Sequence, residues 1–362
     1  MNYYNLKTIL SKDCDYNIII GERSNGKTYA ALYYALKQYV KNKAQFAYIR
    51  RWQEDIIGRR ASAIFAALNK DDVVTKLTDG EYDSVYYYNG CFYLAKKNDK
   101  TGKPVPDITP CGYTFALSDN EHNKSVSYPN VKTIVFDEFL TRRTYLIDEF
   151  MLFMNVLSTI IRQRDNVKIF MLGNTVNKYS PYFSEMGLAH VKQQKQGTID
   201  IYKYGDSGLT VAVEYCASLE SKKKSNKYFA FDNENLQMIT GGAWELSLYP
   251  HLPVKYDYSE ILFIYYIVFD DETLQCEIIN HDNMLFTYVH RKTTPIKKNS
   301  VVYSNLPNAS PYYYKRLLKP IDKISQKIGT FYATEKIYFQ DNSVGEIVRN
   351  YIQATERSQF SH

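Results

Sequence analysis

Apolar residues recur along the first half of the chain in two alternating patterns. Apolar runs predict buried strands at residues 17–20, 46–49, 133–136 and 167–172. Between them, apolar residues spaced three and four positions apart predict helices at residues 28–41, 54–70 and 148–161. Strands that alternate with helices predict an α/β domain in which helices cover a buried sheet.

The remaining segments are patterned differently. Residues 71–117 predict short strands and turns. A polar segment with clustered lysines at residues 222–235, and the pair Gly241-Gly242, indicate a linker or a boundary. Beyond it we expect a β-hairpin from the apolar runs at 261–269 and 276–279, helices near 311–328, a strand at 336–341 and a closing helix.

A chain of 362 residues is long enough for two domains. We predict a first domain at residues 1–210, a linker or lid at residues 211–248, and a smaller α+β domain at residues 249–362.

The first strand leads directly into a glycine-rich motif. The motif reads Gly21-Glu22-Arg23-Ser24-Asn25-Gly26-Lys27-Thr28 and matches G-x-x-x-x-G-K-[ST] at every fixed position. A strand before it and a helix after it are the context that a phosphate-binding loop needs, because backbone N–H groups and the helix N-terminus then face phosphate oxygens. We therefore expect residues 21–28 to bind ATP, with Lys27 at the β- and γ-phosphates and Thr28 as a ligand of Mg²⁺.

A second motif lies where the strand at 133–136 ends. Asp137 and Glu138 follow this strand directly, as expected for the active edge of a parallel sheet. We expect Asp137 to hold the Mg²⁺ shell, and Glu138 to orient and deprotonate the attacking water. An acidic strand end without function is the alternative, and the complete phosphate-binding motif upstream argues against it.

Polar residues also follow the other predicted strands of this sheet. Asn174 comes after the strand at 167–172, where it can sense the γ-phosphate or the water, or serve as a plain turn residue. Arg50 and Arg51 end the strand at 46–49, either at a ligand site or as a solvated basic corner. An extra strand between the phosphate-loop strand and the acidic strand, with a glutamate after the aspartate, predicts a P-loop ATPase of the additional-strand, catalytic-glutamate class.

Composition and charge limit the possible partners and cellular location of the protein. The formal charge of +6 permits a polyanionic partner without requiring one. The five cysteines are scattered without a C-x-x-C pair, so we expect neither a zinc site nor a disulfide framework. The longest apolar run, at 261–269, is too short to span a bilayer, and no signal-peptide pattern occurs. We therefore expect a soluble cytosolic protein without a membrane partner.

Two groups of basic residues are candidates for contact with a DNA backbone. Arg59 and Arg60 belong to the helix predicted at 54–70. Lys97, Lys100 and Lys103 belong to a basic turn at 96–104, for which a solvated turn is the commoner explanation.

The order of these motifs resembles the DNA-packaging ATPase of small protein-primed tailed phages. The resemblance covers residues 15–190 well, whereas the C-terminal third is similar only in layout. It rests on the glycine-rich motif, FAYIRR at 46–51, YPNV at 128–131 leading to TIVFDEF at 133–139, IIRQR at 160–164, and Pro181-Tyr182-Phe183.

The resemblance implies a ring motor, reported as a pentamer in this family. Such a motor docks transiently on the portal of an empty capsid in the host cytoplasm and pushes double-stranded DNA inward with ATP. Arg162 matches an arginine offered in trans by a neighbouring subunit, and Lys124 matches a second trans-acting basic residue. Arg164 is the alternative finger, because it lies only two residues away. Whether a structural RNA lies between motor and portal stays open.

Two features of the resemblance bear on DNA. The family has a lysine shortly after the double arginine where this chain has Gln53, which weakens that DNA contact. The family's C-terminal domain resembles a ribonuclease-H-like nuclease that has lost its catalytic acids. Asp270, Asp271 and Asp341 lie at predicted strand ends here, so a residual metal site is the alternative to a non-catalytic domain.

The sequence thus predicts an ATP-driven double-stranded DNA translocase without nuclease activity. Another translocase or helicase of the same ATPase class is one alternative. A nucleotide-dependent structural module without sustained turnover is the other, and the intact Glu138 and Arg162 argue against it.

Overall fold

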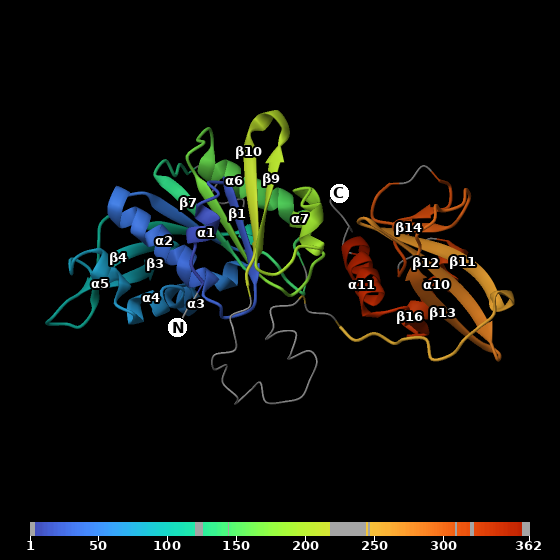
Figure 1. The fold of residues 1–362 in the computed structure, drawn as a ribbon. Coiled ribbons are helices and arrows are strands. Elements are labelled where there is room, and N and C mark those ends of the chain that lie inside the picture. The colour runs from blue at the N-terminus through green and yellow to red at the C-terminus, as the bar shows by residue number, and fades with distance from the viewer. Residues whose placement is uncertain are drawn as a thin grey trace. The chain divides into compact units, whose positions relative to one another are not determined.

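The chain divides into two units in a computed structural model, Met1–Trp244 and Glu245–His362 (Figure 1). The structure describes residues 4–119, 126–143, 145–217, 244, 247–307, 310–318 and 322–356. The boundary predicted at residue 210 is too early, because β10 (Leu209–Tyr215) spans it and pairs with β1 (Tyr16–Gly21) in the first unit. Most of the predicted linker, including its lysine cluster, lies outside the described residues.

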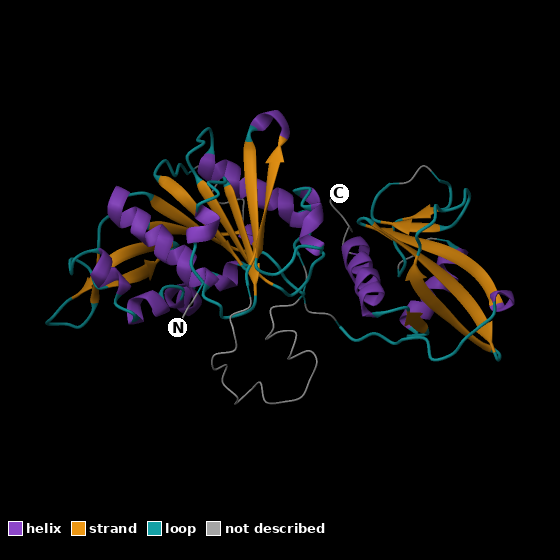
Figure 2. Cartoon of the chain, viewed as in Figure 1, coloured by secondary structure: helices purple, strands orange, loops and turns teal. Residues whose placement is uncertain are grey.

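The first unit is built on one ten-stranded sheet (Figure 2). Its strands lie in the order β3-β4-β6-β2-β7-β8-β1-β10-β9, with β5 paired to β4. Neighbouring strands from β6 to β10 in this order run parallel, whereas β4 and β9 run antiparallel at the two sides. The other bounds are β2 Gln45–Arg50, β3 Ser84–Tyr88, β4 Cys91–Lys97, β5 Pro104–Pro106, β6 Gly112–Ala116, β7 Val131–Asp137, β8 Lys168–Asn174 and β9 Thr198–Tyr204.

Alternation along the strands divides the core of this unit into two layers. Ile18 and Ile20 lie in one buried cluster with the apolar face of α6 (Glu149–Ile161). Ile19 lies in the other cluster, with α2 (Lys27–Asn42). The two long helices therefore cover opposite faces of the sheet, which confirms the predicted α/β architecture (Figure 1).

The remaining helices of the first unit are short. They are α1 Lys7–Leu10, α3 Gly58–Ala63, α4 Ala66–Lys70, α5 Val73–Leu77 and α7 Pro181–Glu185. The single helix predicted at 54–70 is thus wrong in its continuity, because α3 and α4 are separate helices.

Parallel pairing gathers four strand ends on one side of the sheet. β8 lies between β1 and β7, with Gly21 opposite Asn174 and Asp137 opposite Leu172. β2 pairs with the other side of β7 and ends at Arg50. We call this side, where β1, β2, β7 and β8 end, the carboxyl edge.

The second unit contains a six-stranded sheet with the order β15-β14-β11-β12-β13-β16. β11 to β13 form an antiparallel meander, which confirms the predicted hairpin. β14 and β16 run parallel to β11 and β13. The bounds are β11 Ile261–Phe269, β12 Glu272–His281, β13 Met284–Arg291, β14 Val302–Ser304, β15 Tyr313–Tyr314, β16 Ile337–Phe339, α10 Lys323–Ala333 and α11 Asn342–Glu356.

One helix prediction in this unit is wrong over its first part. Residues 311–328 were expected to be helical, but Tyr313 and Tyr314 pair with β14. The helix begins later, where the side chain of Asp322 accepts from the backbone N–H groups of Ile324 and Ser325 and caps it. The apolar run at 261–269 forms β11, and no helix within the described ranges is long and apolar enough to cross a membrane.

Candidate functional site

A tight glycine-rich loop joins β1 to α2 at the carboxyl edge. Gly26 has a φ of 96° and Ser24 a φ of 59°, so the loop turns through left-handed conformations that aim successive N–H groups inward. A Cβ added at Gly21 would lie 2.8 Å from the Cβ of Cys216 on the strand β10 side, so a side chain does not fit there. The loop has the geometry of an anion-binding concavity at a helix N-terminus.

Lys27 points back into this loop and is buried. Its Nζ donates to the backbone oxygens of Gly21 (3.3 Å) and Glu22 (2.8 Å), and to the Oδ1 atoms of Asn25 (3.1 Å) and Asn174 (3.2 Å). Burial lowers the pKa of Lys27 to about 8, although nearby acidic groups oppose the shift. The buried ammonium of Lys27 has few negatively charged neighbours. A phosphate that entered the loop would supply that negative charge.

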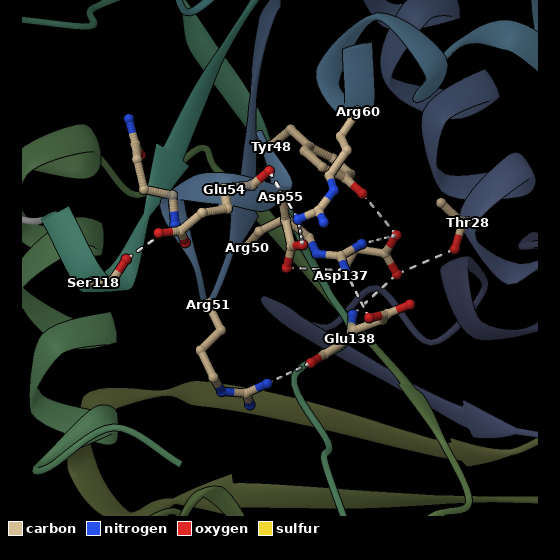
Figure 3. A network of polar contacts seen from close by, with 11 residues as sticks. Thr28, Tyr48, Arg50, Arg51, Glu54, Asp55, Arg60, Ser118, Asp137 and Glu138 are labelled. Carbon is tan, nitrogen blue, oxygen red and sulfur yellow. Dashed lines mark hydrogen bonds and ion pairs between the residues drawn. The ribbon is translucent and has the colours of Figure 1, made fainter. Parts of the chain in front are cut away.

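Asp137, the last residue of β7, lies beside the first turn of α2 (Figure 3). Thr28 Oγ1 donates to Asp137 Oδ1 over 3.2 Å, and the Tyr48 hydroxyl donates to Asp137 Oδ2 over 2.8 Å. Hydroxyl and carboxylate oxygens are the protein ligands that Mg²⁺ prefers, so Thr28 and Asp137 fit a shared ion. Tyr48, which the sequence analysis missed, fixes the orientation of the carboxylate.

Glu138 adopts a left-handed φ of 57° and its side chain is 56% exposed. Its Oε2 lies 2.7 Å from Nη2 of Arg50, whose Nη1 lies 3.8 Å from Asp137 Oδ2. The same guanidinium lies 3.5 Å from Asp55 Oδ2 (Figure 3). Arg50 is therefore not the solvated basic corner considered as an alternative; it holds both carboxylates of the acidic motif.

The next residue, Arg51, is buried and forms a different network. Its Nε and Nη2 lie 2.7 and 2.8 Å from the two carboxylate oxygens of Glu149. Its Nη1 and Nη2 donate to the backbone oxygens of Glu138 (3.2 Å) and Phe139 (2.7 Å). The Tyr182 hydroxyl donates to Glu149 Oε1 over 2.7 Å. This bidentate pair fixes the backbone that carries Glu138.

The carboxyl edge encloses a cavity of about 640 Å³. Arg23, Arg142 and Arg143 line it together with Lys27, and Arg142 Nη1 donates to the backbone oxygen of Val176 over 3.1 Å. The volume and the positive lining suit a nucleoside triphosphate. Sequence analysis missed Arg142 and Arg143, because they lie in a loop with no motif of its own.

The structure thus gathers the predicted nucleotide site at one edge. Residues 21–28, Asp137, Glu138 and Asn174 meet there, and Asn174 contacts Lys27 directly.

The predicted trans-acting arginines lie at the opposite side of the sheet. Arg162 follows α6, is exposed, and donates from Nη2 to the backbone oxygen of Val126 over 3.2 Å. Within the described ranges it forms no ion pair with Asp165. β7 separates this region from Asp137 by about 20 Å at about 3.3 Å per residue, so Arg162 cannot serve the cavity of its own chain. Lys124 lies outside the described residues.

Arg164 is held far more tightly than Arg162. Its guanidinium donates at 2.6 to 3.2 Å to the backbone oxygens of Tyr128, Pro129, Val131, Ile160 and Ile161. These bonds join the end of α6 to the segment that enters β7. This arrangement favours a structural role for Arg164 over the alternative finger.

The candidate DNA contacts fall into two separate places. Arg60 lies in α3 with Nη1 3.3 Å from Asp55 Oδ1, and Arg59 beside it is exposed. Exposed lysines at positions 97, 100 and 103 surround the turn between β4 and β5. β4 starts beside the first residues of β6 and runs antiparallel to it, so the turn after β4 lies toward the edge of the sheet opposite the carboxyl edge.

The acidic residues of the second unit do not form a metal site in the part of it that is described. Asp270 and Asp271 lie in the turn between β11 and β12. Asp341 precedes α11, and its Oδ1 accepts from the N–H of Val344 over 2.8 Å. The described residues contain no group of three or more His, Cys, Asp or Glu side chains placed to hold a metal ion.

The fold and the site are those of an α/β protein with a glycine-rich loop beside paired carboxylates. The chain belongs to the family of podovirus DNA encapsidation proteins (Gp16), whose family model matches residues 1–228.

Curated relatives agree with this membership, and solved structures share the fold. The DNA packaging proteins of Bacillus phages phi29 and PZA are each 32% identical to this chain over 184 residues, which is 50% of this chain and 49% of theirs. The chain thus spans about half the length of the curated relatives it matches. Two solved structures share the fold across nearly their whole length. One is a Phi-28 gp11 DNA packaging motor, with a TM-score of 0.54 and 19% identity over 99% of each chain. The other is the bacteriophage Phi-29 viral genome packaging motor assembly, with a TM-score of 0.59 and 22% identity over 98% of this chain and 100% of that one.

Proposed function

We propose that this protein is an ATP-driven translocase that packages double-stranded phage DNA into a procapsid. The observation that carries the proposal is the carboxyl edge, where Thr28 and Asp137 share a hydrogen bond and Glu138 follows directly. Family membership adds the DNA substrate, because the matched family is described by DNA encapsidation.

Each residue at the carboxyl edge has a defined task in this proposal. The loop N–H groups and Lys27 bind the β- and γ-phosphates, and Asn174 orients Lys27 and senses the γ-phosphate. Thr28 and Asp137 hold Mg²⁺, which when bound neutralises charge on the phosphate oxygens. Glu138 orients the water and accepts its proton. To do so it must first give up the ion pair with Arg50, since that pair occupies the carboxylate.

The strand order supports assignment to the additional-strand, catalytic-glutamate class of P-loop ATPases. β8 lies between the phosphate-loop strand β1 and the acidic strand β7. This insertion places Asn174 between the loop and the carboxylates, at hydrogen-bonding distance from Lys27.

We further propose that the protein acts as a ring, with a pentamer as the expected size. Arg162 is exposed at the side of the sheet away from its own cavity, as a finger for a neighbour's nucleotide requires. Lys124 stays a candidate for the same role on the resemblance alone. The ring would dock on the portal of a procapsid in the host cytoplasm.

The second unit fits a vestigial, ribonuclease-H-like domain without nuclease activity. Its antiparallel meander is flanked by β14, which runs parallel to β11. Duplex DNA would then be contacted through phosphates, with Arg59, Arg60, Lys97, Lys100 and Lys103 as candidates.

A nuclease-protection assay tests the proposed function. Purified protein, procapsids that carry a portal, duplex DNA and Mg²⁺·ATP are incubated together, and DNase is added. We expect wild-type protein to protect DNA, and Glu138→Gln protein at the same concentration to protect none. DNA-stimulated ATP hydrolysis without protection would indicate a different translocase. Absence of any ATP hydrolysis would contradict a motor altogether.

A further inference from the structure

A tyrosine from the N-terminal segment lies against the phosphate-binding loop. The N–H of Tyr4 donates to the backbone oxygen of Asn25 over 3.0 Å. The Tyr4 hydroxyl donates to Glu214 Oε2 over 2.6 Å. Glu214 lies on β10 opposite Ile19 of β1. One residue therefore connects the N-terminal segment, the loop and the strand next to the loop strand.

These contacts hold Tyr4 firmly in one position. A phenol that donates to a carboxylate forms a charge-assisted bond, stronger than a bond between neutral groups. The ring packs against the buried cluster on the α2 side of the sheet. Burial raises the pKa of the Tyr4 hydroxyl, so Tyr4 keeps its proton and stays a donor at neutral pH.

Asn25 extends this connection to the phosphate-binding lysine. Its Oδ1 accepts from the backbone N–H of Lys27 (3.2 Å) and from Lys27 Nζ (3.1 Å). The peptide of Asn25 is thus held from outside by Tyr4, while its side chain holds Lys27 from within. Gly26 follows with a left-handed φ, and a glycine leaves the backbone free to take other conformations. An anchor at Asn25 restricts that freedom.

We propose that Tyr4 is a positioning residue for triphosphate binding. Fixed by Glu214, it holds the loop in the conformation that receives phosphates, and so lowers the entropy lost on binding. The backbone N–H and the hydroxyl of Tyr4 donate to Asn25 and Glu214, so we expect its effect to act on the phosphates through the loop and not on the nucleobase. This inference rests on the proposed function, because it assumes that ATP binds at the loop.

Titration calorimetry on the full chain, with Mg²⁺·ATP and with Mg²⁺·tripolyphosphate, tests the inference. We expect Tyr4→Ala to lower the affinity for both ligands about tenfold. Tyr4→Phe should lower it about threefold, because this variant loses only the hydroxyl. In steady-state kinetics the KM for ATP should rise by the same factors, with kcat almost unchanged. Tyr33→Ala, at an exposed position of α2, is the matched control and should bind as wild type does.

Changes at Glu214 separate this role from a general loss of structure. Glu214→Gln keeps an oxygen that can accept from Tyr4 and should retain most of the affinity. Glu214→Leu should match Tyr4→Phe, and the double variant should be no weaker than either, because both remove the same bond. These variants test the positioning role of Tyr4 even if Tyr4→Ala fails to fold. Thermal unfolding would show whether Tyr4→Ala folds.

Three results would overturn the inference. The first is unchanged affinity in Tyr4→Phe and Glu214→Leu. The second is a loss for ATP with none for tripolyphosphate, which would assign Tyr4 to the nucleoside. The third is additive losses in the double variant. Failure of the wild type to bind either ligand would instead overturn the proposed function, and this inference with it.

Discussion

Two arginines at opposite edges of the first unit's sheet, Arg50 and Arg164, are held in different ways. At the carboxyl edge, Arg50 contacts the side chains of Asp55, Asp137 and Glu138. At the opposite side, Arg164 donates to backbone oxygens from two segments. A carboxylate side chain can rotate to another partner, whereas a backbone oxygen moves only with its segment. Arg50 can therefore change partners during a reaction, whereas Arg164 holds two segments of the fold together.

The largest expected effect is the loss of ATPase activity when Arg162 is replaced. Arg162 lies two positions from Arg164 in the sequence, but it has one backbone partner in the described chain. Arg162→Ala should lower the ATPase rate of assembled rings by about 10³–10⁵-fold, the usual value of an arginine finger. A mixture of Arg162→Ala with Glu138→Gln should regain activity, since one interface can then combine both intact residues. ATP hydrolysis of the mixture is measured against each variant alone.

Assembly is the necessary control for that mixture. If sedimentation shows rings and the mixture does not exceed either variant, Arg162 is not the finger. Lys124 would then be the remaining candidate from the resemblance.

The buried pair behind the acidic motif gives the next largest effect. Arg51→Met should cost about 3–5 kcal/mol of unfolding free energy, because Glu149 would be left buried without its partner. Arg51→Met combined with Glu149→Leu should recover most of that loss. Urea unfolding followed by circular dichroism measures both variants. Equal stability of the single variant and the wild type would contradict a structural role for this pair.

Stability should also separate the two neighbouring arginines. Arg164→Met removes donors from several partly buried backbone oxygens and should cost about 1–3 kcal/mol. Arg162→Met, exposed and with one backbone partner, should change stability by less than about 0.5 kcal/mol. The same urea experiment compares them. The reverse ranking would contradict the assignment of Arg164 to the fold.

The smallest effect concerns pH and Lys27. Burial lowers its pKa to about 8, and a bound triphosphate favours the charged form, so the pKa in the complex is higher. ATP binding therefore takes up a proton above pH 8, and affinity should fall by up to about tenfold per pH unit as pH rises from 8. Titration calorimetry between pH 7 and 9 measures this slope. Lys27→Met should show none of it over the same range.

The parts of the site that sequence predicts well are local in the chain. The glycine-rich loop and the Asp137-Glu138 pair are each contiguous, and their physical requirements are met by neighbouring residues. The different environments of Arg50 and Arg51 could not be predicted, because their partners come from β7 and α6, about 90 residues away. Tyr4 and Glu214 are 210 positions apart and carry no motif.

The distinction between local patterns and distant partners also explains the errors in the prediction of the fold. The local pattern predicts a linker where most of β10 lies, because its partner strand β1 lies near the start of the chain. The local pattern also predicts a helix at residues 313–314, but pairing with β14 determines their conformation. Long-range pairing outweighs local pattern in both segments.

We propose that the carboxyl edge hydrolyses ATP with Glu138 as the base. Measuring ATP binding and single-turnover hydrolysis of Glu138→Gln in parallel tests this role. We predict binding within about threefold of wild type, because Lys27, Thr28 and Asp137 remain, and hydrolysis slower by about 10²–10⁴-fold. Near-normal hydrolysis by this variant would contradict the claim.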